Sequence, residues 1–165
     1  MTRRAAFEQA LEALGRADGR NIRIDYRWGA AIADNIRKHA AEIIAVAPDV
    51  ILTSSNIVLA PVMQATRSIP IVFVRVIDPV GSGFVESLAR PGGNVTGFTQ
   101  FEYSLATKWV ELLKQIAPHS TRAAVIRDPT RGPGIGQFAV TQAIAPSLGI
   151  ELKPINALGR LLSAS

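Results

Sequence analysis

Apolar residues recur along this chain with two alternating periods, one typical of helices and one typical of strands. They are spaced as one face of a helix over residues 7–14, and over 22–26 they alternate with polar residues as in a strand with one polar face. The alternation then continues, predicting helices over 34–47, 54–65, 104–116 and 135–148, and strands over 50–53, 71–76, 95–99, 122–127 and 149–152. Strands that alternate with helices imply βαβ units, so we predict an α/β fold with a mostly parallel sheet flanked by helices.

The ends of these elements carry their own signals. Asp34 is a predicted N-cap, and Val50-Ile51-Leu52 is a short apolar run expected of a strand covered on both faces. One βα series ends and another begins between Ala117 and Thr121. We therefore predict two domains, a first lobe over 1–117 and the start of a second lobe over 118–165.

Candidate ligand-binding residues stand where the predicted parallel strands end. In an open parallel sheet the ligand lies beyond the carboxyl ends of the strands, because loops and helix N-termini converge there. Ser54, Ser55 and Asn56 follow the 50–53 strand, and their hydroxyl and amide groups suit a carboxylate or another anion. The alternative is that they only cap the next helix.

Two carboxylates and one aromatic segment occupy the other strand ends. Asp78 and Asp128 each follow a strand and precede a proline, so they either bind an ammonium or hydroxyl group of a small ligand or simply terminate the strands. Gln100 and Phe101 follow the 95–99 strand, where they are candidates for a pocket wall or for ordinary packing.

Composition removes several classes of chemistry. The chain has no cysteine, which excludes disulfides, thiolate nucleophiles and cysteine-bound metal clusters. Its 18 lysines and arginines against 13 acidic residues give a net charge of +5, but these charges are spread out, so no nucleic-acid partner is expected. His39 and His119 have no partner for catalysis or metal binding nearby in the sequence, and we expect no cofactor and no enzymatic activity.

A glycine-rich stretch, 131–136, follows a predicted strand and precedes a predicted helix. It lacks the lysine and hydroxyl residue of a phosphate-binding P-loop and is out of register for a dinucleotide motif. We expect a flexible loop here; the alternative is an enzyme that uses a nucleotide. Nor does the chain show a signal-peptide pattern or a run long enough to span a membrane, so the protein is expected to be cytoplasmic if expressed as written.

Longer stretches of the chain resemble one bacterial family. The central stretch comprises 70–74 (PIVFV), 78–85 (DPVGSGFV) and 87–98 (SLARPGGNVTGF), and supporting segments lie at 19–28, 108–114 and 145–150. These segments are similar to the TrpX-like group of type I periplasmic binding proteins, which are substrate-binding proteins of ABC transporters. The likeness runs from about Phe7 to about Ile155.

The resemblance implies a bilobed protein whose α/β lobes close on a small molecule, an amino acid or a similar compound, and deliver it to an ABC permease. It also implies a periplasmic location. By position, the expected contacts come from both lobes: Ser54, Ser55, Asn56, Asp78, Gln100 and Phe101 from the first, and Asp128 from the second.

This sequence also departs from the family pattern. Members begin with an export signal and an apolar strand, whereas here the first predicted helix starts at the initiator methionine, and the likeness fades after Ile155. We therefore expect a first lobe without its first strand, a truncated second lobe and impaired ligand binding. The alternative function is the ligand-sensing domain of a transcription regulator, which shares the fold.

Overall fold

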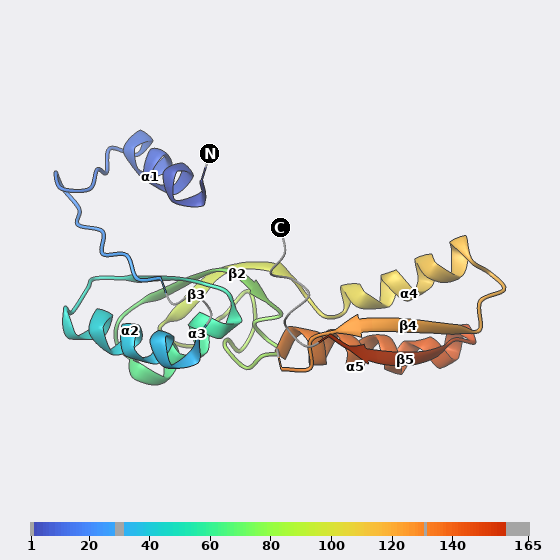
Figure 1. The fold of residues 1–165 in the computed structure, drawn as a ribbon. Coiled ribbons are helices and arrows are strands. Elements are labelled where there is room, and N and C mark those ends of the chain that lie inside the picture. The colour runs from blue at the N-terminus through green and yellow to red at the C-terminus, as the bar shows by residue number, and fades with distance from the viewer. Residues whose placement is uncertain (1, 29–31, 131, 158–165) are drawn as a thin grey trace.

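The structure is a computed structural model that describes residues 2–28, 32–130 and 132–157, and within them two parallel sheets with helices packed beside them (Figure 1). The first sheet has the order β1 (Ile51–Ser54), β2 (Ile71–Ile77), β3 (Val95–Phe101), and the second pairs β4 (Arg122–Arg127) with β5 (Glu151–Asn156). The predicted α/β class with parallel sheets is confirmed.

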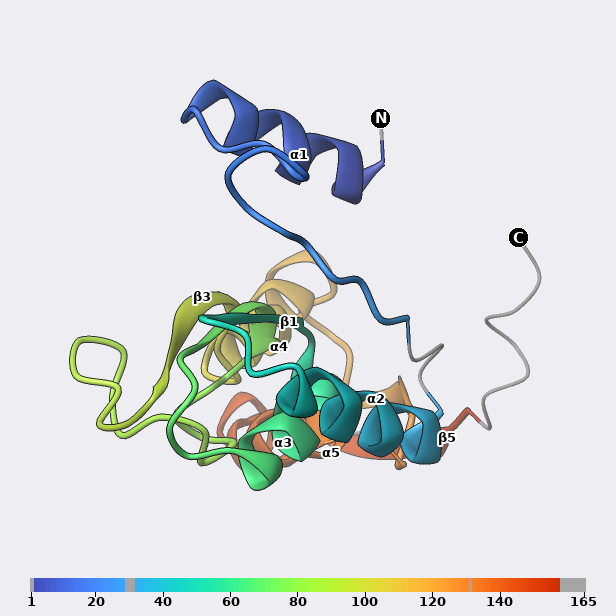
Figure 2. The same cartoon turned by 90° about the vertical axis from the view of Figure 1, so that its left-hand side faces the viewer.

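The helices fall into three groups. Their bounds are α1 (Arg3–Ala13), α2 (Ala33–Ala45), α3 (Asn56–Ala65), α4 (Leu105–Ile116) and α5 (Gly132–Ile144), which a 3₁₀ turn, η1 (Ala145–Leu148), extends. Helices α2 and α3 pack together, and α3 packs on β1 and β2. Helix α4 packs against α5 and η1, while α1 stands apart from both groups (Figures 1 and 2).

The larger core lies between the first sheet and helices α2 and α3. The strand register aligns Ile51 with Ile71 and Ile71 with Val95, so a row of buried side chains crosses all three strands. Leu59 of α3 and Phe73 of β2 are almost fully buried beside this row. Each such side chain contributes about 1.5–3 kcal/mol to folding, which makes this core the main source of stability.

The second core is smaller and includes α4. Val110 of α4 is buried together with Ala145 and Ile150, and Leu113 and Leu152 pack against them. Helix α4 therefore packs with the second sheet rather than with the first. The predicted division between residues 117 and 118 stays a prediction.

The segment 22–26 does not form the predicted strand. Its side chains do alternate, with Ile22, Ile24 and Tyr26 half-buried between exposed polar residues. Its backbone, however, forms only an isolated bridge between Asp18 and Ile22. Strand β1, the next strand along the chain, pairs with β2 alone and lies at the side of its sheet, so it does not pair with this segment. An alternating pattern makes a strand only where a partner strand supplies the hydrogen bonds, and none pairs with this segment among the described residues.

Three other expectations at element ends are corrected. Helix α2 has Ile32 as its N-cap, and Asp34 lies in its first turn instead. Only one face of β1 is covered, because Leu52 is 48% exposed. Strand β3 runs on to Phe101, so Gln100 and Phe101 belong to the strand and do not follow it.

The glycine-rich stretch is helical, not a flexible loop. Residues 132–136 form the first turns of α5, while Arg131 lies outside the described residues. Two of these glycines have close neighbours. A Cβ on Gly134 would strike the carbonyl oxygen of Asp128, and one on Gly136 would strike the ring of Tyr103. Glycine at these two positions thus permits close packing of the helix start.

Helix α1 is attached to the rest of the chain by polar contacts. None of its residues is buried. Glu8 accepts hydrogen bonds from Arg4 Nε at 2.8 Å and from the Tyr26 hydroxyl at 2.9 Å, and the Arg4 guanidinium lies 4.5 Å from the centre of the Tyr26 ring. Burial and the Glu8 carboxylate raise the pKa of Tyr26, and these same bonds lower the pKa of Glu8.

Candidate functional site

The carboxyl ends of β1, β2 and β3 lie side by side at the same end of the first sheet, as expected for parallel strands. This end of the sheet is its carboxyl edge. Ser55 follows β1, and its backbone N–H donates to the Val74 carbonyl at 3.2 Å. Asp78 follows β2, and its backbone N–H donates to the Phe101 carbonyl of β3 at 2.9 Å. Ser55, Asp78 and Phe101, which are far apart in the sequence, therefore meet at this edge.

Asn56, the first residue of α3, connects that helix to the end of β2. Its Nδ2 donates to the Ile77 carbonyl at 2.8 Å, and its Oδ1 accepts from the Ile77 N–H at 2.9 Å. Nδ2 also lies 3.2 Å from the Ser82 hydroxyl. The Asn56 amide thus holds the start of α3 against the end of β2.

Asp78 holds a tight loop at the edge. Its Oδ1 accepts from the Gly81 N–H at 2.8 Å, and its Oδ2 lies 3.4 Å from the Tyr103 nitrogen, which donates to it. Asp78 has φ of 43° and Ser55 has φ of 83°, both in the left-handed region that non-glycine residues rarely adopt. Such strained residues cluster at functional sites, where the surrounding structure holds them in place.

The remaining first-sheet candidates have different surroundings. Ser54 and Gln100 are exposed, Ser54 at the end of β1 and Gln100 within β3. The Phe101 ring packs edge-on against Trp109 of α4, with 6.2 Å between the ring centres. Phe101 therefore contacts the helix that belongs to the second core.

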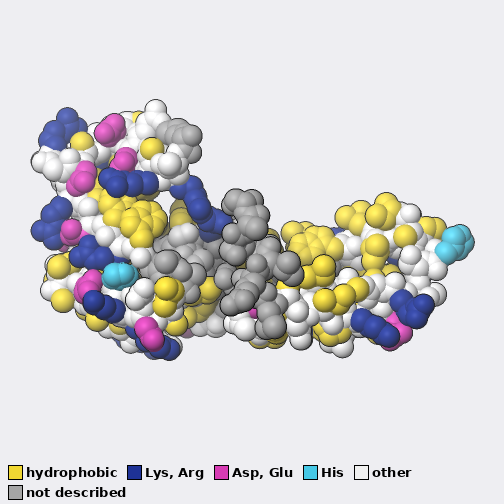
Figure 3. Space-filling model, viewed as in Figure 1, with side chains coloured by type: hydrophobic (Ala, Val, Ile, Leu, Met, Phe, Trp, Pro, Cys, Tyr) yellow, Lys and Arg dark blue, Asp and Glu magenta, His cyan; other side chains and the backbone are white. Residues whose placement is uncertain are grey.

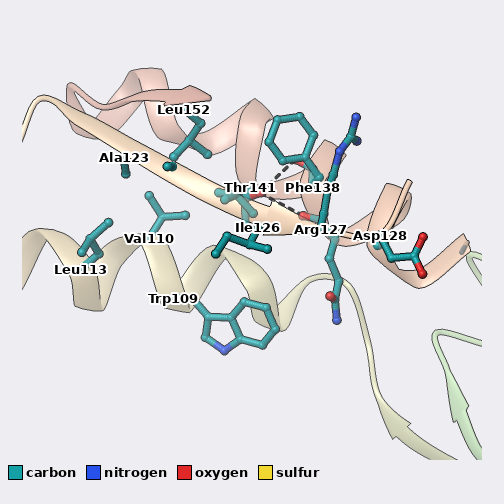
Figure 4. Close-up of a pocket in the computed structure, with 14 residues that line it drawn as sticks. Trp109, Val110, Leu113, Ala123, Ile126, Arg127, Asp128, Phe138, Thr141 and Leu152 are labelled. Atoms are coloured by element: carbon teal, nitrogen blue, oxygen red, sulfur yellow. Dashed lines mark hydrogen bonds between the residues drawn. The ribbon is translucent and has the colours of Figure 1, made fainter. Parts of the chain in front are cut away.

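Asp128 lies at the end of β4, at one end of a groove of about 350 Å³ between α4, β4 and α5 (Figure 4). Its Oδ1 accepts from the Thr130 N–H at 2.9 Å and from the Thr130 hydroxyl at 2.6 Å. Trp109 and Phe138 line the same groove, and the Arg127 guanidinium lies 4.4 Å from the centre of the Phe138 ring. The groove is therefore mainly apolar, with a polar end at Asp128.

Two residues of this region were not among the sequence candidates. Ser82 donates to the Ile77 carbonyl at 3.3 Å and contacts Asn56; in the sequence it lies between two glycines of the 78–85 stretch. Tyr103 belongs to no motif; it lies between β3 and α4, and its contacts with Asp78 and Gly136 are visible only in the structure.

In residues 2–28, 32–130 and 132–157 no three His, Asp or Glu side chains are grouped so that they could hold a metal ion. In the same ranges, no helix has the length and apolar character needed to cross a bilayer.

The chain is similar in sequence to known proteins of one family. Residues 1–160 match the family described as "ABC transporter substrate binding protein". This chain belongs to that family. A curated relative, a "Tyrosine-binding protein" from Clostridioides difficile (strain R20291), is 35% identical over 120 residues, which is 73% of this chain and 34% of the relative. The resemblance found in the sequence is confirmed.

Solved structures that are similar to this chain have the same fold. A conserved domain protein from Vibrio cholerae is 30% identical, with a TM-score of 0.81 over 94% of this chain and 52% of that one. A ligand-free, open substrate-binding protein with adhesive properties from Clostridium difficile is also 30% identical, with a TM-score of 0.68 over 93% and 52%. The chain thus spans about a third of the curated relative and about half of these solved structures.

Proposed function

We propose that this chain is part of the substrate-binding component of an ABC importer, and that the component binds an amino acid at the carboxyl edge of the first sheet. The observation that carries the proposal is the meeting of Ser55, Asn56 and Asp78 at that edge, in a chain of the substrate-binding family. The family is one of solute-binding proteins, and we propose no catalytic step.

The chemistry of the edge suits both charges of an amino acid. The N-terminus of α3, which begins at Asn56, presents the backbone N–H groups of its first turn and the positive end of the helix dipole to a carboxylate. Asp78 supplies a carboxylate for the ammonium group. Ser54, Gln100 and Phe101 would form the adjoining wall, and Asp128 would approach from the second sheet. The 35% identical relative is named as a tyrosine-binding protein, which makes L-tyrosine the first ligand to test.

The remaining parts of the proposal come from the family. Its members are periplasmic or extracellular substrate-binding proteins, so we propose that the complete protein works outside the cytoplasm and delivers its ligand to an ABC permease. The alternative of a transcription regulator gains no support from the relatives named above.

The test is an NMR titration of the ¹⁵N-labelled chain with L-tyrosine, because chemical shifts report weak as well as tight binding. We expect shift changes at Ser55, Asn56 and Gly81 that saturate with ligand. D-Tyrosine and tyramine serve as ligand controls, since the first inverts the amino-acid stereocentre and the second lacks the carboxylate.

The matched protein variants are Asp78→Asn and Asp49→Asn. Asp78→Asn keeps an acceptor for Gly81 but removes the charge, and it should weaken binding roughly 10-fold. Asp49 is exposed and precedes β1, at the opposite edge of the sheet, so Asp49→Asn should leave binding unchanged. Equal effects of the two variants, or shift changes confined to other parts of the chain, would contradict the proposed site.

A further inference from the structure

Tyr103 lies in the connection from β3 to α4. It contacts both halves of the structure, of which the first comprises the first sheet with α2 and α3, and the second comprises the second sheet with α4 and α5. Its backbone N–H points to Asp78 Oδ2 of the first half, with 3.4 Å between nitrogen and oxygen. Its half-buried ring lies against the backbone of α5 in the second half, because a Cβ added to Gly136 would be 2.5 Å from Tyr103 Cζ. One residue therefore joins the loop after β2 to the start of α5.

The space that this ring occupies exists only because residue 136 is glycine. Gly132, one turn earlier in the same helix, has nothing within 4 Å of the position of a Cβ. Close approach is therefore a property of the Gly136 position and not of α5 as a whole.

These contacts run from the Asp78 carboxylate to the backbone of Asp128. Asp78 contacts Tyr103, the Tyr103 ring contacts Gly136, and Gly134 of the same helix turn packs on the carbonyl oxygen of Asp128. Each link is direct, so a displacement of the Tyr103 ring moves the start of α5 relative to the edge that carries Asp78.

We infer that Tyr103 is a positioning residue whose ring, seated on Gly136, sets the separation between the first-sheet edge and the start of α5. Its meaning for ligand binding rests on the proposed function, in which Asp78 and Asp128 lie on opposite sides of the ligand. The separation itself can be measured without any ligand.

The experiment is double electron–electron resonance on the chain labelled at Gln64→Cys in α3 and Lys153→Cys in β5. The natural sequence has no cysteine, so these two residues are the only ones labelled, and both positions are exposed. We expect Gly136→Ala to shift or broaden the distance distribution, because the added methyl group displaces the Tyr103 ring. Gly132→Ala, in the same helix, should keep the original distribution.

The double variant identifies the ring as the cause. Tyr103→Ala should broaden the distribution by itself, and Tyr103→Ala with Gly136→Ala should equal Tyr103→Ala alone, because the group that the methyl strikes is gone. Tyr103→Phe keeps the ring and should match the original chain.

Three results would overturn the inference: an unchanged distribution in both Gly136→Ala and Tyr103→Ala, an additive double variant, or a Phe variant that behaves like Ala. If Gly136→Ala does not fold, the comparison of Tyr103→Ala with Tyr103→Phe decides alone. The distances are measured without ligand, so the expected distributions are the same whether or not the chain binds L-tyrosine. The inference and the proposed function can therefore fail separately.

Discussion

At the scale of single residues, Asn56 and Asp78 at the carboxyl edge of the first sheet form hydrogen bonds with the backbone of the protein itself. Asn56 donates to and accepts from Ile77, and Asp78 accepts from the N–H groups of Gly81 and Tyr103. These bonds hold the strand ends and loops in the shape that a ligand meets. The same residues can therefore be tested by stability as well as by binding.

Asn56→Ala should lower the free energy of unfolding by about 1–3 kcal/mol, because both polar groups of the Ile77 backbone lose their side-chain partner. Urea denaturation followed by circular dichroism measures the change. Asn35→Ala, at an exposed position of α2, is the control and should stay within about 0.5 kcal/mol of the original chain. Equal stabilities of the two variants would show that the Asn56 bonds contribute nothing.

Tyr26 should titrate above the ordinary tyrosine pKa, because burial and the Glu8 carboxylate disfavour the phenolate. Since the folded-state pKa is raised, the stabilisation from this group is complete below the ordinary tyrosine pKa and is lost as pH rises through the raised value. NMR titration of the tyrosine ¹³Cζ signals measures the pKa directly.

Glu8→Gln tests the cause of this shift. It removes the negative charge beside the hydroxyl, so the pKa of Tyr26 should fall towards its ordinary value. The urea-unfolded chain gives the reference titration. A Tyr26 pKa that is the same in the folded and unfolded chains would contradict the contact with α1.

At the scale of elements, pairing decides which apolar segments become strands. Strand β2 lies between β1 and β3 and pairs with both, whereas the 22–26 segment has the right alternation and no partner strand among the described residues. The pairing of β2 with β3 also depends on one residue without a side chain. Gly97 lies opposite Phe73, and a Cβ at Gly97 would strike the Phe73 carbonyl oxygen and lie 2.6 Å from the Phe73 nitrogen.

Gly97→Ala should therefore destabilise the first sheet by about 3 kcal/mol or more, because backbone atoms of a central strand cannot move aside cheaply. Thermal and urea unfolding of the variant give the value. Gly93→Ala is the matched control, since a Cβ there has nothing within 4 Å, and it should change stability little. A Gly97→Ala variant as stable as Gly93→Ala would mean that β2 and β3 do not approach this closely.

At the scale of the whole molecule, the described residues leave a large apolar surface uncovered. Leu112 is 54% exposed and Ile116 is 81% exposed, on the side of α4 that faces away from the second core. Figure 3 shows hydrophobic side chains gathered over α4, at the upper right. Contiguous exposed apolar patches of this kind bind hydrophobic dyes and promote association.

The double variant Leu112→Gln with Ile116→Gln should lower the fluorescence of the bound dye ANS while changing stability by no more than about 0.5 kcal/mol, because both side chains are exposed. Val110→Gln is the contrasting variant. Val110 is buried in the second core, so its replacement should lower stability and raise dye binding. Unchanged dye fluorescence in the double variant would place the dye-binding surface elsewhere.

The order and type of most elements could be predicted from the sequence because they depend on local periodicity. Helix α3 and strands β2 and β4 lie close to the predicted ranges, and the sheet edge that collects Ser55, Asn56 and Asp78 follows from parallel pairing alone. Family membership was also visible, because the stretch 70–98 is long and specific.

The tertiary structure decided everything that depends on contacts between distant residues. The Asn56 amide meets a backbone 21 residues away, so no local pattern distinguishes it from a helix cap. The glycines of 132–136 read as a loop in sequence, but Gly134 and Gly136 lie in a helix where close packing against Asp128 and Tyr103 requires them. Local periodicity thus determined the elements and their order, whereas partner choice at the site was decided by long-range packing, which residue spacing does not encode.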